Sequence, residues 1–247
     1  MNAAKPRRAL WVGSFALTTL AAWILSLPAF HHQRPVNPGN PSTLQDFNAG
    51  DRNREAQQHA TDLLKAMKAT PGDWVADVGA GAGYYSMRLS AIVGPRGKVF
   101  AEDIWDPAIK WLDLRVKLFE LHNVEVVKGD DDNPRLPAGS LAEVLVVNAY
   151  HHFEKYGPMD EQILHALKPG GRLVIADYSM PSHRQEARAD QVKIHEIGPD
   201  LVRAELTRLG FRVLTCEDPF VKGMPKVAIS YGPKGIDMWL MVAVRPQ

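Results

Sequence analysis

Short apolar runs alternate with segments of helical periodicity from about residue 51 onward, and this pattern predicts an α/β fold. The predicted strands are 74–78, 98–101, 123–128, 142–147, 172–178, 211–216 and 236–244. The predicted helices are 51–69, 84–93, 106–122, 159–167 and 200–209. Strands that alternate with helices in this way are typical of βα units around a mainly parallel sheet.

Four segments add detail to this pattern. The run AEVLVV at 142–147 is the most continuously apolar, so we expect that strand at the centre of the sheet. Residues 180–196 lack regular periodicity and are rich in charge and histidine, which favours a lid or substrate loop. Residues 219–235 are predicted to form a hairpin excursion over the sheet edge. A helix over 51–69 is predicted to use Asp51 as its N-cap.

The stretch WVADVGAGAGYYSMRL, Trp74–Leu89, is predicted to be a buried strand, a tight turn and the start of a helix. Its glycines allow a ligand to approach the backbone, and the helix start offers unpaired N–H groups. A nucleotide-like ligand fits such a loop, whereas a glycine-rich turn without a ligand is the alternative. The nicotinamide fingerprint G-x-G-x-x-G requires a third glycine where this chain has Tyr84.

The loop and its flanks resemble the class I S-adenosylmethionine-dependent methyltransferases. The resemblance rests on D-x-G-x-G-x-G at 77–83, on LKPGGRLVIADY at 167–178 and on Y-H-H at 150–152. It implies a Rossmann-like α/β fold: a seven-stranded, mostly parallel sheet with helices on both faces and an antiparallel last strand. It also implies S-adenosyl-L-methionine as the cofactor.

The resemblance places the cofactor contacts at the ends of the predicted strands. The acid and glycines of the loop hold the amino-acid end and the ribose, Asp103 binds the ribose hydroxyls, and acids after 123–128 meet the adenine. Glu102 is the neighbour to Asp103, and Trp105 is a further candidate wall for the adenine. The predicted cofactor-binding residues are Asp77, Gly79, Gly81, Gly83, Tyr84, Asp103, Ile104, Asp130, Asp131 and Asn148. A solvated turn is the alternative for the three aspartates at 130–132.

Histidines after the strand 142–147 are the candidate catalytic groups. Methyl transfer from a sulfonium needs alignment with the nucleophile, and a base where the nucleophile carries a proton. Histidine accepts a proton near neutral pH, so we expect His151 and His152 first and His195 next, with Tyr150 orienting the acceptor. A purely structural role for the paired histidines is the alternative.

The acceptor is expected to be a small molecule. The Asn-Pro-Pro-Tyr element of nucleic-acid amino-methyltransferases is absent, because Ala149 follows Asn148. The net charge also favours a small-molecule acceptor. Of the 29 basic residues, Lys5, Arg7, Arg8 and Arg34 precede residue 35, which leaves 25 basic and 28 acidic residues in the rest of the chain. This balance of about −3 gives no basic excess for nucleic acid.

No metal ion is expected from the sequence. Cys216 is the single cysteine, which excludes an internal disulfide and a cysteine-cluster zinc site. The adjacent His31 and His32 lie in a proline-rich segment and are expected to be solvated. The oligomeric state is left open.

The amino terminus carries an uncharged apolar run at 9–30, after three basic residues. At about 1.5 Å per residue this run is long enough to cross roughly 30 Å of hydrocarbon. We therefore divide the chain into a membrane anchor or signal segment at 1–30, a linker at 31–50 and a methyltransferase domain at 51–247. A cleaved signal and a buried core helix are the alternatives for the apolar run.

The basic flank lies before the apolar run, and the positive-inside rule places it in the cytoplasm. The expected protein is then membrane-anchored with an extracytoplasmic domain, periplasmic in a bacterium, or exported and soluble if the segment is cleaved. S-adenosylmethionine is made in the cytosol, so this orientation requires a supply of cofactor that the sequence does not reveal.

Two functions compete with methyl transfer. A non-catalytic, membrane-tethered protein would bind S-adenosylmethionine without consuming it. A nicotinamide-dependent oxidoreductase is disfavoured by Tyr84 at the third-glycine position.

Overall fold

The computed structural model describes residues 51, 54–55, 57–224 and 236–247 of this chain, all within the unit Pro35–Gln247. The predicted anchor and linker at 1–50 and most of the predicted excursion at 219–235 lie outside the described residues. Among the residues that are described, no helix has both the length and the apolar character needed to cross a membrane.

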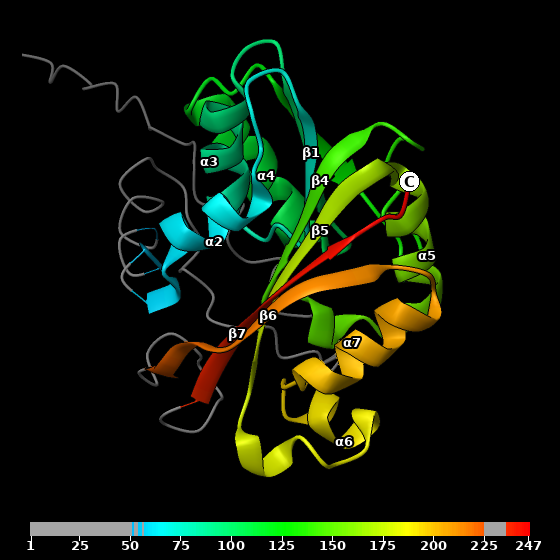
Figure 1. Cartoon of the computed structure of the whole chain (residues 1–247). Helices are drawn as coiled ribbons and strands as arrows, with labels where there is room; N and C mark the ends of the chain where they lie inside the picture. The colour runs from blue at the N-terminus through cyan, green and yellow to red at the C-terminus, as the bar shows by residue number, and fades with distance from the viewer. Residues whose placement is uncertain (1–50, 52–53, 56, 225–235) are drawn as a thin grey trace, which may run out of the picture. The chain divides into compact units, whose positions relative to one another are not determined.

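Seven strands form one sheet in the order β3-β2-β1-β4-β5-β7-β6 (Figure 1). The strands are β1 Trp74–Val78, β2 Lys98–Asp103, β3 Val124–Lys128, β4 Leu141–Val147, β5 Leu167–Ser179, β6 Arg212–Met224 and β7 Ile236–Val244. Neighbouring strands from β3 to β5 are parallel, whereas β7 lies between β5 and β6 and is antiparallel to both. The predicted Rossmann-like sheet with an antiparallel last strand is confirmed, and β4 lies at its centre.

Helices cover both faces of this sheet (Figure 1). They are α2 Ala60–Met67, α3 Tyr84–Val93, α4 Asp106–Leu118, α5 Tyr156–Ala166, α6 Arg188–Lys193 and α7 Pro199–Arg208, with 3-10 turns η1 Tyr150–His152 and η2 Pro181–His183. Successive strand residues point to opposite faces. Val75 therefore packs with α2 and α3, whereas Ala76 packs in the second core with α5 and α7.

The helix predicted over 51–69 is the clearest difference at an element boundary. The described residues 51, 54, 55, 57 and 58 are helical, but His59 interrupts the helix with a left-handed backbone, φ 47°, and α2 begins at Ala60. Asp51, the predicted N-cap, instead accepts two hydrogen bonds of 3.0 Å from the guanidinium of Arg115 on α4. Asp51 is thus itself helical, and its ion pair with a buried arginine on α4 is a long-range contact that sequence periodicity cannot show.

Two further differences concern regions of weak periodicity. The segment 180–196 contains η2 and the short helix α6 and is not wholly irregular. These elements are held by the buried side chain of Gln191, which donates to the carbonyl of Glu186 at 2.9 Å and accepts from the N–H of Gly198 at 2.7 Å. Strand β6 runs on to Met224 through breaks in its register with β7.

Burial in the central strand predicts a large effect of truncation there. Leu145 of β4 is 0% exposed, so Leu145→Ala removes buried apolar surface and leaves a cavity. We expect the free energy of unfolding to fall by roughly 2–5 kcal/mol. Leu214 on β6 is 39% exposed and provides the matched control. Urea denaturation measures both losses, and equal losses for Leu145→Ala and Leu214→Ala would contradict the assigned core.

Candidate functional site

The glycine loop between β1 and α3 lies at the carboxyl edge of the sheet. Gly79 and Gly81 both have positive φ, 72° and 58°, in the left-handed region that favours glycine. A Cβ on Gly79 would lie 2.5 Å from the Cβ of Ala149, so the loop packs directly against the chain that leaves β4. No atom of the described residues lies within 4 Å of a Cβ placed on Gly81. Gly79 is therefore required by packing, whereas Gly81 is open to a ligand.

Two buried carboxylates at the end of β2 hold this loop. The N–H of Gly79 donates to Glu102 Oε2 at 3.3 Å, and the N–H of Gly81 donates to Asp103 Oδ2 at 2.9 Å. The other oxygen of Asp103 accepts from the N–H of Trp105 at 2.8 Å. Asp103 thus lies at the junction of two loops, at the position where the sequence predicted a ribose contact.

Asp77 lies beneath the loop. Its carboxylate is 2% exposed and accepts a 2.6 Å hydrogen bond from the hydroxyl of Ser86 in the first turn of α3. Burial raises the pKa of Asp77 from 3.8 to about 6, in spite of this hydrogen bond. The residue therefore ties the end of β1 to α3 from the interior side.

Tyr84 begins α3 and is buried, with 2% of its surface exposed. Its hydroxyl donates to Glu55 Oε2 at 2.5 Å, and Arg88 pairs with the same oxygen at 2.8 Å. Burial raises the pKa of Tyr84, so the phenol stays protonated as a donor at neutral pH. A hydrogen bond from Thr61, followed by that from Tyr84, lowers the pKa of Glu55. No local pattern in the sequence indicates that Glu55 joins this region.

The aspartates after β3 are engaged by surface cations. Asp130 pairs with Arg135 at 2.7 Å, while Asp131 and Asp132 pair with Lys155 at 3.2 Å and 3.1 Å. The charge pairs match the solvated-turn alternative, and the adenine contact of Asp130 or Asp131 stays a prediction.

The loop after β2 presents two further predicted residues. The carbonyl of Ile104 accepts from Lys128 Nζ at 2.5 Å. Trp105 is 36% exposed, with its ring centroid 5.2 Å from that of Trp111. Both residues lie directly beside Asp103, so the predicted adenine contacts are next to the carboxylate predicted to bind the ribose.

The structure brings together the three histidines that the sequence named. His151 and His152 lie in η1, directly after β4, and His195 follows α6. The ring centroids of His151 and His152 are 4.0 Å apart, and His195 lies 5.7 Å and 5.3 Å from them. We refer to these three residues as the histidine cluster. Only the tertiary fold joins His195, some forty residues later, to the other two.

Asp177 of β5 fixes the orientation of His151. Its carboxylate is 0% exposed and lies 2.9 Å and 3.1 Å from His151 Nδ1, and it accepts from the backbone N–H of His151 at 3.1 Å. A carboxylate beside Nδ1 selects the tautomer with the proton on that nitrogen, which leaves a lone pair on Nε2. Sequence reasoning missed Asp177, although it lies within the LVIADY phrase.

Asn148 precedes the cluster in a left-handed conformation with φ 52°, and its N–H donates to the carbonyl of Ala176 at 2.8 Å. This turn redirects the chain from β4 into η1. Asn148 therefore stays a candidate for cofactor contact at the strand end, with a clear structural role in delivering the histidines.

Tyr150 does not join the cluster, contrary to the predicted acceptor-orienting role. It is 0% exposed, and its hydroxyl bonds to Asp160 at 2.6 Å and to Glu205 at 2.9 Å in the core that contains α5 and α7. Burial raises the pKa of Asp160 to about 7 and also raises that of Glu205. The reason is geometric: neighbours in a 3-10 turn point about 120° apart, so Tyr150 and His151 diverge.

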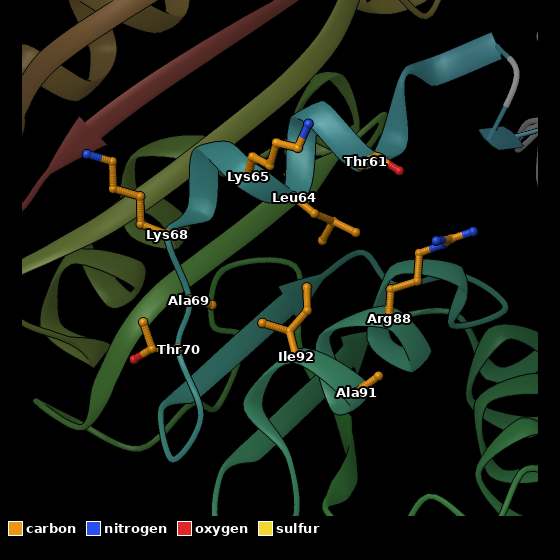
Figure 2. Close-up of a pocket in the computed structure, with 9 residues that line it drawn as sticks. All are labelled: Thr61, Leu64, Lys65, Lys68, Ala69, Thr70, Arg88, Ala91 and Ile92. Carbon is orange, nitrogen blue, oxygen red and sulfur yellow. The ribbon is translucent and has the colours of Figure 1, made fainter.

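A groove of about 670 Å³ lies between α2 and α3 (Figure 2). It is lined by Thr61, Leu64, Lys65, Lys68, Ala69, Thr70, Arg88, Ala91 and Ile92. Thr70 precedes β1 and Ile92 lies near the end of α3, so the groove is close to the amino end of β1. Its lining residue Arg88 also pairs with Glu55, which accepts a hydrogen bond from Tyr84 at the start of α3.

Comparison with known proteins agrees with this arrangement. Residues 75–171 match the family described as "Methyltransferase domain". The demethylmenaquinone methyltransferase of Listeria welshimeri is 29% identical over 121 residues, 49% of this chain and 51% of that protein. The ubiquinone/menaquinone biosynthesis C-methyltransferase of Pseudomonas putida is 29% identical over 119 residues, 48% of this chain and 46% of that protein. This chain thus spans about half the length of the curated relatives it matches.

Similarity to solved structures extends over more of the chain. A SAM-dependent methyltransferase from Aquifex aeolicus superposes with a TM-score of 0.64 at 22% identity, covering 85% of this chain and 98% of that one. The fold is therefore a Rossmann-like methyltransferase fold. The family match at 75–171 includes the glycine loop, Asp103, His151 and His152, whereas His195 and Asp177 lie beyond it.

The raised pKa of Asp77 predicts a pH-dependent stability difference. The folded-state pKa of Asp77, about 6, exceeds its ordinary value of 3.8. The protonated carboxyl group therefore contributes stability that is fully present below pH 3.8 and is lost as the pH rises through 6. Asp77→Asn cannot ionise, so its unfolding free energy relative to wild type should increase by up to ~3 kcal/mol between pH 4 and pH 7. Urea denaturation across this range measures the difference.

Asp106→Asn is the control for this experiment. A hydrogen bond from Lys128 lowers the pKa of Asp106, so wild type should gain stability over that variant as the pH rises through the acidic range. A difference for Asp77→Asn that stays constant or shrinks with pH would contradict the assignment.

Proposed function

We propose that this protein is an S-adenosylmethionine-dependent methyltransferase that acts on a small-molecule acceptor. The observation that carries the proposal is the carboxyl edge of the sheet, where an open glycine, a buried acid and the histidine cluster lie on adjacent strand ends. Ligands of open α/β sheets bind at this edge, near the point where the strand order reverses. In this sheet the order reverses between β1 and β4, which is where Gly79 meets Ala149.

Cofactor binding follows from the loop and its supports. Gly81 leaves room for the ligand against the backbone, and Asp103 is fixed beside it by two N–H groups. An ionised carboxylate is an acceptor of hydrogen bonds, so Asp103 has the chemistry that ribose hydroxyls require of a partner. Asp77, Gly83 and the ring of Tyr84 support the loop from within, and the Ile104 loop lies beside the adenine.

The transfer step needs little covalent chemistry from the protein. The nucleophile attacks the methyl carbon in line with the carbon–sulfur bond, which breaks with its electron pair on sulfur and gives S-adenosylhomocysteine. The histidine cluster lies beside the loop that would hold the donor. His151, oriented by Asp177, directs a lone pair from Nε2 that is available to a proton or to a cation.

The acceptor class is supported by charge and by the relatives. The part of the chain after residue 34 has a net charge of about −3, which does not favour nucleic acid. The matched relatives are named for demethylmenaquinone and for ubiquinone and menaquinone biosynthesis, so quinols and related aromatic hydroxyls head the acceptor panel.

The sequence also supports a membrane association, which we include in the proposal. The apolar run at 9–30 with its basic flank would tether the domain, on the extracytoplasmic side by the positive-inside rule. A tether of this kind suits an acceptor that dissolves in the lipid phase.

The open side of Gly81 predicts a selective loss of cofactor affinity. A methyl group there projects into the ligand space, so Gly81→Ala should weaken S-adenosylmethionine binding at least tenfold in calorimetric titration. Gly72→Ala is matched, because Gly72 also has positive φ (99°) and no described atom near its Cβ, but lies before β1. Comparable affinity in both variants would show that the loop does not hold the cofactor. Tighter binding of NAD than of S-adenosylmethionine by wild type would favour the oxidoreductase alternative.

The histidine cluster predicts a loss of turnover without a loss of cofactor. We expect His151→Ala to reduce S-adenosylhomocysteine formation with an accepted substrate at least 100-fold, while the Kd for S-adenosylmethionine changes less than threefold. The exposed His165 on α5 provides the control, His165→Ala. Full turnover in His151→Ala would remove the cluster from the reaction. Cofactor binding without product across the panel would favour the binding-only alternative.

A further inference from the structure

One ring nitrogen from each of His151, His152 and His195 can be chosen so that all three lie within 4.8 Å of one another. Imidazole nitrogens are common ligands of Zn²⁺ and of the other late first-row divalent ions, whereas Mg²⁺ and Ca²⁺ prefer oxygen. We propose that the histidine cluster is a binding site for a divalent transition-metal ion, with Zn²⁺ as its reference occupant.

The spacing of the rings suits this ligand set. Zinc–nitrogen bonds of about 2.0–2.1 Å in a tetrahedral site place ligand nitrogens roughly 3.3 Å apart. Reaching this separation from 4.8 Å requires a contraction of about 1.5 Å at most, which rotation of the side chains supplies. Three neutral imidazoles also leave one coordination position open, as in catalytic zinc sites and unlike closed structural ones.

His151 has the environment of a metal ligand. Its Nδ1 is held by the fully buried Asp177 at 2.9 Å, and its Nε2 is buried without a hydrogen-bond partner among the described residues. Leaving a buried polar atom without a hydrogen bond is unfavourable, and a bound ion would offset that cost. A carboxylate on the second nitrogen of a metal-bound histidine is a recurring outer contact, because it fixes the tautomer and raises the basicity of the ligand.

The backbone around the cluster is held in uncommon conformations. His195 has φ 59°, and Asn148, three residues before His151, has φ 52°. Left-handed conformations at residues other than glycine are strained and concentrate at functional sites. The turn at His195 is maintained by its N–H, which donates to the carbonyl of Val192 at 3.0 Å, and by the hydrogen bonds of Gln191. Both segments that carry histidines are thus shaped to bring the rings together.

The metal ion would take a direct part in methyl transfer. This catalytic role rests on the proposed function, whereas the metal site itself does not. An acceptor hydroxyl or thiol that takes the open position would ionise at lower pH and release its proton to solvent. The resulting anion attacks the methyl carbon, the carbon–sulfur bond breaks, and sulfur keeps the electron pair as the thioether. In this role the lone pair of His151 Nε2 binds the metal ion, so His151 acts as a metal ligand and not as a base.

Direct metal binding by the full-length, untagged protein tests the site. After treatment with a chelator, titration with Co²⁺ should produce the intense visible absorption of a histidine-bound, four-coordinate ion with one equivalent bound, and Zn²⁺ should abolish it. His195→Ala and His152→Ala should each weaken Co²⁺ binding at least 100-fold. Asp177→Asn should weaken it 10- to 100-fold through loss of the outer contact.

Two controls separate this site from other histidines. The double variant His31→Ala, His32→Ala removes the adjacent pair in the amino-terminal segment and should retain full binding, as should His165→Ala. Circular dichroism verifies that each variant is folded, and the titration of wild type does not depend on any variant.

Absence of stoichiometric Co²⁺ absorption in wild type, or unchanged binding in folded His195→Ala, would overturn the metal site. Full methyl transfer by chelated protein would overturn the catalytic role of the ion while leaving the proposed function intact. Metal binding without any S-adenosylmethionine binding would refute the proposed function and leave the metal site standing.

Discussion

The close approach of Gly79 to Ala149 is the contact on which the carboxyl edge of this sheet depends. Because a Cβ on Gly79 would lie 2.5 Å from that of Ala149, the glycine loop and the chain leaving β4 share a space that only glycine permits. The contact places the loop beside η1, and thereby places Gly81 and Asp103 next to the strand end that carries His151. This packing brings the glycine loop and the histidine cluster to the same edge of the sheet.

Buried carboxylates then fix each part of the edge. Glu102 and Asp103 accept from the loop backbone, Asp77 holds the first turn of α3, and Asp177 orients His151. Each of these groups is at least 97% buried, and each accepts hydrogen bonds from neighbouring backbone or side-chain groups. Carboxylates removed from water in this way are costly unless they are bonded, so they hold their partners in defined positions. The site is therefore positioned by acids that need not contact a substrate.

Particular residues show where sequence reasoning succeeds and where it stops. The helix Tyr84–Val93 and the strands Trp74–Val78 and Ile236–Val244 were predicted with the observed bounds, because their apolar periodicity and flanking glycines are local signals. Asp51, predicted to cap a helix, is itself helical, and its carboxylate binds the distant Arg115. Tyr150 was assigned to the site with His151, but its hydroxyl bonds to Asp160 and Glu205, since a 3-10 turn separates neighbouring side chains.

The sequence by itself determined the order of strands and helices along the chain, the glycine loop, the acid at the end of β2 and the residues of the histidine cluster. Each of these is indicated by residue types and their spacing within a short segment. The same order predicted an α/β fold, and the resemblance to class I methyltransferases implied its Rossmann-like form. Only the tertiary structure decided that His195 meets His151 and His152, and that Asp177 orients His151 with its lone pair on Nε2. It also decided that a neighbouring residue occupies the space beside Gly79 but not the space beside Gly81. These facts depend on contacts between segments distant in the chain, for which the spacing of residues along a single sequence carries no signal.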